Sequence, residues 1–140
     1  MPTFVLETDI AAAPERCFAI LRDPRLHPET TVDHEGELAI GQIVRFESRF
    51  VGMRTLLELE VTEFDPPNFV TDELRNGIFR EFRHRHEFRA AGKGTLMIDT
   101  VTWTLPVGPL GRLFDGIAAA RLRSVITARN ARLKALAEGD

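Results

Sequence analysis

The sequence predicts an α+β fold, in which an antiparallel sheet is covered by one long C-terminal helix. Between residues 3 and 104, several short segments alternate apolar and polar side chains, which is typical of strands with one buried face. From Pro109 onward, apolar residues instead recur every three or four positions, which is typical of an amphipathic helix. Because the strands follow one another without helices between them, an antiparallel sheet is favoured over a parallel one. The length of 140 residues suits a single domain over residues 1–140.

The N-terminal part predicts one strand followed by one or two short helices. Alternation at Thr3–Ile10 indicates the strand, and Pro14 lies in the first turn of the helix that follows. Asp23-Pro24 ends this helix. Its buried side would consist of Cys17, Phe18 and Leu21. Because Cys17 is the only cysteine, the sequence excludes an intrachain disulfide and a cysteine metal cluster.

Six further strands are predicted before the long helix. The expected ranges are 30–38, 43–50, 57–61, 69–74, 78–89 and 95–104. Asn76-Gly77 predicts a hairpin between the fourth and fifth of these ranges, and Gly92-Lys93 predicts a turn between the last two. The positions of the long helix that follow the spacing of three and four are Leu110, Leu113, Phe114, Ile117, Leu122, Val125, Ile126, Arg129, Leu133 and Leu136.

The last two predicted strands can be aligned by counting. If Gly92 and Lys93 form the loop, Ala91 pairs with Gly94, and every later pair follows. The resulting cross-strand pairs are Phe88 with Met97, His86 with Asp99, His84 with Val101, and Phe82 with Trp103. These side chains share one face, and the opposite face is dominated by charged residues and threonine. The alignment therefore predicts that two histidines and one aspartate lie on the buried, aromatic face of the sheet.

Polar groups on a buried face need partners or a function. In a structural interpretation, His86 and Asp99 pair with each other, and His84 binds a backbone carbonyl or a water molecule. In a functional interpretation, the three groups orient a ligand in an apolar pocket, and Asp99 tunes the proton chemistry of His86. In a third interpretation they form a two-histidine, one-carboxylate metal site; His27 and His34 lie in loops that the sequence does not place next to it. Because only three ligands are visible, we expect no metal and no other cofactor.

Composition and charge argue against several classes of protein. The formal net charge of −3 gives no electrostatic reason for binding nucleic acid. The first ten residues lack the basic and apolar regions of a signal peptide, and no apolar run approaches the roughly 20 residues that span a bilayer. Neither Ser48 nor Ser124 lies in a nucleophile-elbow motif. We therefore expect a cytoplasmic protein without stable membrane insertion.

Several segments, in their order along the chain, resemble one known family. They are Phe4–Ile10 with Ala13–Phe18, Gly41–Phe46, Phe69–Glu73 with Gly77–Phe79, Phe82–Phe88, Thr95–Val101, Leu105–Gly108 and the final helix. The chain resembles the START-like (SRPBCC) superfamily, and especially small bacterial proteins described as polyketide cyclase/dehydrase-like ligand-binding proteins. The resemblance implies the helix-grip fold, in which about seven antiparallel strands wrap around the C-terminal helix and enclose a deep apolar cavity. It implies no catalytic residues, because the family has no universal ones, and the iron of the superfamily's oxygenases belongs to an additional cluster-binding domain with no counterpart in this sequence.

Three functional hypotheses follow. The first is a binding module, monomeric or homodimeric, that holds a small hydrophobic or aromatic molecule such as a lipid or polyketide between sheet and helix. The second is a cyclase, dehydratase or hydrolase that uses His86 as general acid/base, held by Asp99. The third is a helper protein that contacts another polypeptide through its helix or a sheet edge. In the first hypothesis the ligand-binding residues are Phe46, Phe50, Leu57, Leu59, Phe82, Phe88, Met97, Val101, Trp103, Phe114 and Ile117, with His84, His86 and Asp99 at the polar end.

Overall fold

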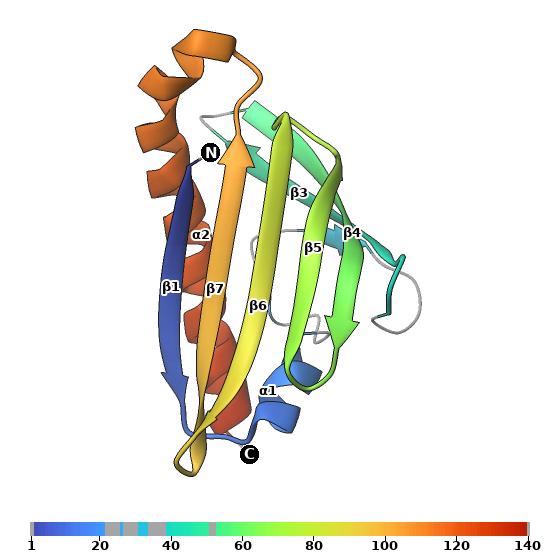
Figure 1. The fold of residues 1–140 in the computed structure, drawn as a ribbon, viewed down its shortest axis with the longest axis vertical. Helices are drawn as coiled ribbons and strands as arrows, with labels where there is room; N and C mark the ends of the chain where they lie inside the picture. The colour runs from blue at the N-terminus through green and yellow to red at the C-terminus, as the bar shows by residue number, and fades with distance from the viewer. Residues whose placement is uncertain (1, 22–25, 27–30, 34–38, 51–52, 140) are drawn as a thin grey trace.

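The computed structural model describes residues 2–21, 26, 31–33, 39–50 and 53–139 (Figure 1). The strands are β1 (Thr3–Ile10), β2 (Thr31–Asp33), β3 (Ile43–Phe50), β4 (Met53–Asp65), β5 (Phe69–Asn76), β6 (Glu81–Ala91) and β7 (Gly94–Thr104). The helices are α1 (Pro14–Ile20) and α2 (Gly111–Glu138), and a short 3-10 turn, η2 (Gly108–Leu110), precedes α2. No helix in these described ranges is both long enough and apolar enough to cross a membrane.

The seven strands form one antiparallel sheet in the order β1-β7-β6-β5-β4-β3-β2. Helix α2 runs along one face of this sheet, behind β1 and β7 in the view of Figure 1, and α1 lies near its C-terminal end. The α+β fold predicted from the strand and helix patterns, and the helix-grip arrangement implied by the resemblance, are therefore confirmed.

Several strand boundaries differ from the predicted ones; the ends of β5 and β6 and the start of β7 differ by one or two residues. β4 extends beyond both ends of the predicted range 57–61, and its register with β5 shifts at two places, which interrupts a simple alternation. β6 begins at Glu81 instead of residue 78, and residues 77–80 form a bend that lengthens the predicted hairpin connection. In the predicted range 30–38 the structure describes residues 31–33, all of which form β2; the rest of the range lies outside the described residues, as does the predicted end of the first helix at Asp23-Pro24.

The predicted alignment of the last two strands is confirmed. Ala91 pairs with Gly94, and the four predicted pairs between the inward-facing residues of β6 and β7 all occur. Gly92 has a φ of 61°, a left-handed conformation that suits glycine in this two-residue turn. A side chain at Gly94 would collide with the carbonyl oxygen of Ile10, so glycine allows the end of β1 to approach β7 closely.

The interior between the sheet and the helices contains two apolar clusters with a polar layer between them. The lower cluster, next to α1 and the C-terminal end of α2, consists of Ile10, Cys17, Phe18, Ile20, Leu26, Val61, Val70, Phe88, Met97, Leu133 and Ala137. The upper cluster, next to the first half of α2, consists of Phe4, Leu59, Phe79, Phe82, Val101, Trp103, Ala118 and Ile126. We define the polar layer as the buried side chains of His84, His86, Asp99, Arg129 and Asn130.

The inward side of α2 agrees with the sequence pattern in the second half of the helix but not in the first. Ile126 and Leu133 are buried, as the spacing predicts. In the first half the buried positions are Gly111 and Ala118, which are too small to register in a pattern of large apolar residues. The exposed members of the predicted stripe are Leu110, Leu113, Phe114, Ile117 and Val125. The predicted burial of these five residues is therefore wrong: the first turns of α2 present small residues inward and large apolar residues outward.

Candidate functional site

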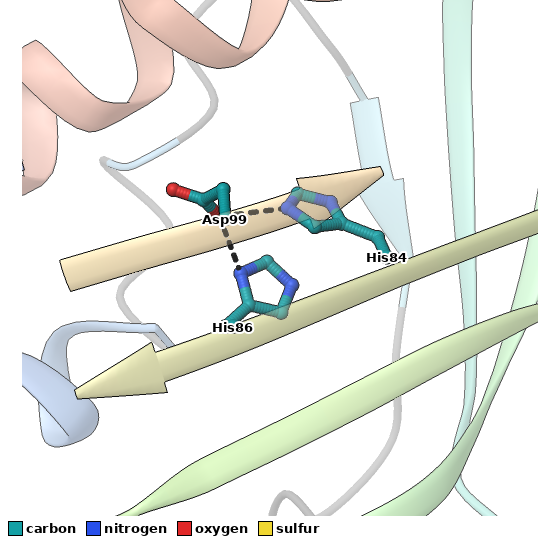
Figure 2. A group of neighbouring side chains, drawn as sticks. All are labelled: His84, His86 and Asp99. Carbon is teal, nitrogen blue, oxygen red and sulfur yellow. Dashed lines mark hydrogen bonds and ion pairs between the residues drawn. The ribbon is translucent and has the colours of Figure 1, made fainter. Parts of the chain in front are cut away.

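The polar layer is built by two neighbouring strands and by α2. β6 places His84 and His86 on its inward face two residues apart, and β7 places Asp99 directly opposite His86 (Figure 2). These side chains are inward because strand residues alternate between faces, so they share the face of the buried aromatics on β6. All three are buried, and Asp99 is fully inaccessible. The prediction that they meet on the buried face is confirmed.

Asp99 is the centre of the layer. Its Oδ1 lies 2.7 Å from Nε2 of His84, 3.1 Å from Nδ1 of His86 and 2.7 Å from a terminal nitrogen of Arg129. Its Oδ2 accepts a hydrogen bond of 2.7 Å from the amide of Asn130. Burial alone would raise the pKa of Asp99, but the positive charge of Arg129 and the hydrogen bonds from both histidines hold that pKa well below its usual value. Asp99 is therefore ionised in the folded protein.

His84 is the neutral histidine of the pair. Burial, reinforced by the positive charge of His86, lowers the pKa of His84 to about 4. The neutral ring donates its Nε2–H to Asp99. The two imidazole rings are stacked, with centroids 3.8 Å apart and planes inclined by 28°. Because two stacked cations would repel each other, at most one of the two rings is protonated.

His86 is the more basic ring of the pair. Burial and the charge of Arg129 favour the neutral ring, but hydrogen bonds to Asp72 and Asp99 outweigh them and raise the pKa of His86. Its Nε2 lies 3.2 Å from Oδ2 of Asp72, and its Nδ1 lies 3.1 Å from Oδ1 of Asp99. The imidazolium form donates one N–H to each carboxylate. Arg129 also lies 3.2 Å from Nδ1, where it donates a hydrogen bond to the neutral ring; this bond and a proton on Nδ1 exclude each other.

The charges of this network balance when His86 is protonated. Asp72 and Asp99 then supply two negative charges, and His86 and Arg129 supply two positive ones. A buried network of this kind is costly to desolvate and is stable only when its hydrogen bonds are complete. The predicted pairing of His86 with Asp99 is confirmed, whereas Nε2 of His84 also binds Asp99, where the sequence predicts a backbone carbonyl or a water molecule.

The residues of the polar layer do not fit a metal centre. One ligand atom from each of His84, His86 and Asp99 lies within 4.8 Å of the others, which by itself is compatible with a metal ion. However, the guanidinium of Arg129 lies 2.7 Å from Oδ1 of Asp99 and 3.2 Å from Nδ1 of His86. This fixed cation already binds the same ligand atoms and would repel a second positive charge. His27 and His34 lie outside the described residues.

Three members of the network are missing from the residues predicted for the site. Asp72 lies on β5 opposite His84 and reaches His86 from the same face of the sheet. Arg129 and Asn130 come from α2. Arg129 interrupts the apolar spacing of the long helix, and a charged residue at such a position is a signal for a buried charge. No comparable signal distinguishes Asp72 or Asn130 in the sequence.

The apolar residues predicted to bind the ligand are distributed over both halves of the interior. Those in the upper cluster or packed against it are Phe46, Leu57, Leu59, Phe82, Val101 and Trp103. Phe88 and Met97 belong to the lower cluster. Phe114 and Ile117 are 48% and 55% exposed, so the structure does not bring them to the sheet. The side chain of Phe50, on β3, lies outside the described part of the chain.

Trp103 brings an unsatisfied donor into the upper cluster. Its side chain is 2% exposed, and its ring packs against Phe4 with centroids 5.6 Å apart. Among the described residues, the indole Nε1 of Trp103 and Oγ1 of Thr62 are the buried side-chain polar atoms without a hydrogen-bond partner. A buried donor without an acceptor costs about 1–3 kcal/mol. Trp103 lies four residues from Asp99 on the same face of β7, so the upper cluster separates this donor from the polar layer.

Comparison with known proteins places the fold among related structures. Residues 1–138 match the family model described as polyketide cyclase/dehydrase and lipid transport. No curated protein sequence matches the chain. A solved protein from Thermus thermophilus is 20% identical, with a TM-score of 0.75, over 96% of this chain and 99% of its own. A START superfamily protein from Mycobacterium smegmatis is 17% identical, with a TM-score of 0.76, over 96% of this chain and 98% of its own.

A two-domain protein also aligns with this fold. The di-domain ARO/CYC protein StfQ from the steffimycin biosynthetic pathway is 14% identical, with a TM-score of 0.78, over 97% of this chain and 50% of its own. At these identities the structures establish the shared fold, and the match to the family model extends over nearly the whole sequence. The chain therefore belongs to the polyketide cyclase/dehydrase and lipid transport family.

Proposed function

We propose that this protein binds a small, mostly apolar molecule between the sheet and the first half of α2. The observation that carries the proposal is the unpartnered Nε1 of Trp103 in an otherwise apolar cluster. A ligand with a carbonyl, ether or hydroxyl oxygen would give this donor an acceptor and remove the cost of leaving it unpaired. Apolar walls with a few polar groups are the usual composition of a small-molecule site.

The first half of α2 is the part of the molecule that can admit such a ligand. Its buried positions are Gly111 and Ala118, which contribute little apolar area to the interior. Moving this part of the helix away from the sheet therefore costs less hydrophobic stabilisation than moving the C-terminal end of α2, which carries Leu133. In the proposal, a ligand enters the upper cluster by displacing these first turns, and its oxygen accepts a hydrogen bond from Trp103.

The polar layer forms the inner limit of the proposed site. Every residue of the layer has hydrogen-bond partners within the protein, so the layer can act as a fixed floor without depending on the ligand. In the proposal, His84, His86 and Asp99 form a rigid polar boundary of the site. The end of the ligand that faces this boundary is apolar or forms only weak hydrogen bonds with it.

Native mass spectrometry of freshly purified protein is the first test. An organic adduct of a few hundred daltons, identified after solvent extraction, supports the proposal and names the ligand class. The donor is tested with acetylnaphthalene and ethylnaphthalene, which differ by a carbonyl oxygen. We expect the wild-type protein to prefer the ketone by roughly fivefold to tenfold, since a neutral hydrogen bond contributes about 1 kcal/mol.

The variant Trp103→Phe keeps an aromatic ring and removes the indole N–H, so it should lose this preference while still binding both probes. Titration calorimetry measures all four affinities. Equal affinities of the wild-type protein for the two probes would contradict the role of Nε1, and failure of both to bind in the upper cluster would contradict the site.

The raised pKa of His86 supports a second candidate, an enzyme of the cyclase, dehydratase or hydrolase type. A histidine with a raised pKa holds its proton to higher pH, and in its protonated form it can donate that proton to a carbonyl or leaving group. In this candidate His86 is the general acid and Asp99 holds its ring. His86→Gln would then abolish turnover of a bound substrate and leave its affinity within about threefold, whereas parallel loss of binding and turnover would indicate a structural role.

A further inference from the structure

The first turns of α2 and the segment before them expose an unusual number of large apolar side chains. The group consists of Val107, Leu110, Leu113, Phe114 and Ile117, which are 44%, 57%, 72%, 48% and 55% exposed. We call this group the apolar cap. It lies at the upper end of α2 in Figure 1, where the chain leaves β7 and enters the helix. Exposed apolar residues scattered singly are ordinary, but five within eleven positions form a patch that indicates a contact surface.

The charges near the cap have one predominant sign. Between Leu105 and Val125 the sequence contains three arginines (Arg112, Arg121 and Arg123) and one acidic residue (Asp115), a local balance of +2 in a chain whose formal net charge is −3. Arg112 and Arg121 are exposed. Arginines around an apolar helical face favour a partner with an apolar interior and a negatively charged surface.

The size of the cap argues against a second copy of this chain as the partner. Five side chains exposed by about half offer on the order of 500 Å², within the range of the largest patch on a monomer. A stable dimer buries roughly 800 Å² on each partner, so the cap alone is too small for one. In addition, a symmetric contact through the cap would bring the arginines of both copies together.

We propose that the apolar cap docks this protein on the surface of an anionic lipid bilayer. The inserted side chains would be those of the cap, and Arg112 and Arg121 would contact the lipid phosphates. The inference goes beyond ligand binding, because docking requires only the outward face of α2. It also places the inward face of the same turns, which covers the upper cluster, directly above the lipid.

Co-sedimentation with lipid vesicles tests the proposal. The probes are vesicles of phosphatidylcholine alone and of phosphatidylcholine mixed equally with phosphatidylglycerol. We expect binding to the mixed vesicles, weaker binding to the neutral ones, and a decrease with added salt. Leu113→Ser should weaken binding roughly tenfold, because it removes the most exposed apolar side chain of the cap. Arg112→Gln should weaken it roughly fivefold, only on the anionic vesicles.

Matched controls separate docking from general effects of substitution. Val125→Ser removes an apolar side chain that is 41% exposed on the same helix but outside the cap. Lys93→Gln removes a positive charge in the β6–β7 turn, at the opposite end of the molecule in Figure 1. Both controls should bind as the wild type does. The proposal is overturned by a lack of sedimentation with either vesicle, by equal effects of control and cap variants, or by sedimentation velocity showing a dimer that Leu113→Ser dissociates.

Discussion

The two ends of α2 are held to the rest of the protein in different ways. At the C-terminal end, Arg16 of α1 donates hydrogen bonds of 2.7 Å and 3.2 Å to the carbonyl oxygens of Ala137 and Leu136. Lys134 donates a hydrogen bond of 2.6 Å to the backbone oxygen of Asp9, and Glu138 accepts one of 2.7 Å from the backbone of Ala11. These contacts fasten the helix to α1 and to the end of β1.

The N-terminal end of α2 shows the opposite arrangement. Its buried positions are Gly111 and Ala118, and its large apolar residues are exposed. Local opening has a low free-energy cost where few apolar contacts would be lost. From this comparison we expect the C-terminal end of α2 to be held more firmly than its N-terminal end, next to which we propose that the ligand binds.

The largest effect is expected at the layer that joins the two halves. Asp99→Asn keeps the shape of the side chain but removes the negative charge between Arg129 and His86. Removing one partner of a buried ionic network costs about 3–5 kcal/mol, so the free energy of unfolding in urea should fall by about that amount. Asp9→Asn, at an exposed position, should change it by less than about 0.5 kcal/mol. A loss below about 1 kcal/mol for Asp99→Asn would mean that the network contributes little to holding the halves together.

Matched truncations compare the two apolar clusters directly. Leu133→Ala, at a fully buried position of the lower cluster, should cost about 3 kcal/mol of unfolding free energy and leave ligand affinity unchanged. Ile126→Ala, in the upper cluster, should cost about 2 kcal/mol and also change the affinity for the naphthalene probes. Urea unfolding and titration calorimetry give both quantities. If the two variants alter the affinity equally, the proposal that ligand binding is confined to the upper half of the interior is wrong.

The histidines predict a stability maximum near pH 6.5. The folded pKa of His84 is lowered to about 4, so below pH 6.5 the unfolded chain gains a proton that the folded chain resists, and stability falls as the pH drops toward 4. The folded pKa of His86 is raised, so its contribution is complete below pH 6.5 and is lost as the pH rises through that pKa. Each limb has a slope of at most about 1.4 kcal/mol per pH unit.

Substituting each histidine in turn shows which one causes the acid limb and which one causes the alkaline limb of the pH–stability profile. Urea unfolding across this pH range should show the acid limb removed in His84→Gln and the alkaline limb removed in His86→Gln. A pH profile that neither substitution changes would exclude the proposed protonation states.

The smallest effect is expected at the fastening of the helix end. Arg16→Ala removes both hydrogen bonds to the last turn of α2 and should cost about 1 kcal/mol, because the guanidinium is partly exposed to solvent. Hydrogen exchange at the backbone amides of residues 134–138 should accelerate, while exchange in the first turns stays unchanged. Arg16→Lys keeps the charge but cannot reproduce both bonds, so its exchange rates should be intermediate. Accelerated exchange at both ends of α2 would show that the two ends open together.

The sequence predicts the β6–β7 pair well, because a two-residue turn at Gly92 fixes the register and the alternation on both strands agrees with it. The partners contributed by other elements are harder to predict. The position of Asp72 opposite β6 depends on the length of the connection at residues 77–80. The contact of Asn130 with Asp99 depends on which side of α2 faces the sheet. Neither quantity follows from local spacing, since the inward side of α2 is set in part by glycine and alanine.

The buried charges also determine how far along its axis α2 can sit. Sliding the helix by one turn, a shift of about 5.4 Å, would carry Arg129 from Asp99 into one of the apolar clusters, where an unpaired charge is strongly disfavoured. The polar layer thus fixes the position of α2 along its axis and allows only one way for the helix to dock on the sheet. The contacts that fix this position do not involve the side chains of the upper cluster. Residues such as Leu59 and Phe82 can therefore change in size and shape without moving the helix. In the binding role proposed above, substitutions in the upper cluster would change the ligand preference and leave the docking of α2 on the sheet intact.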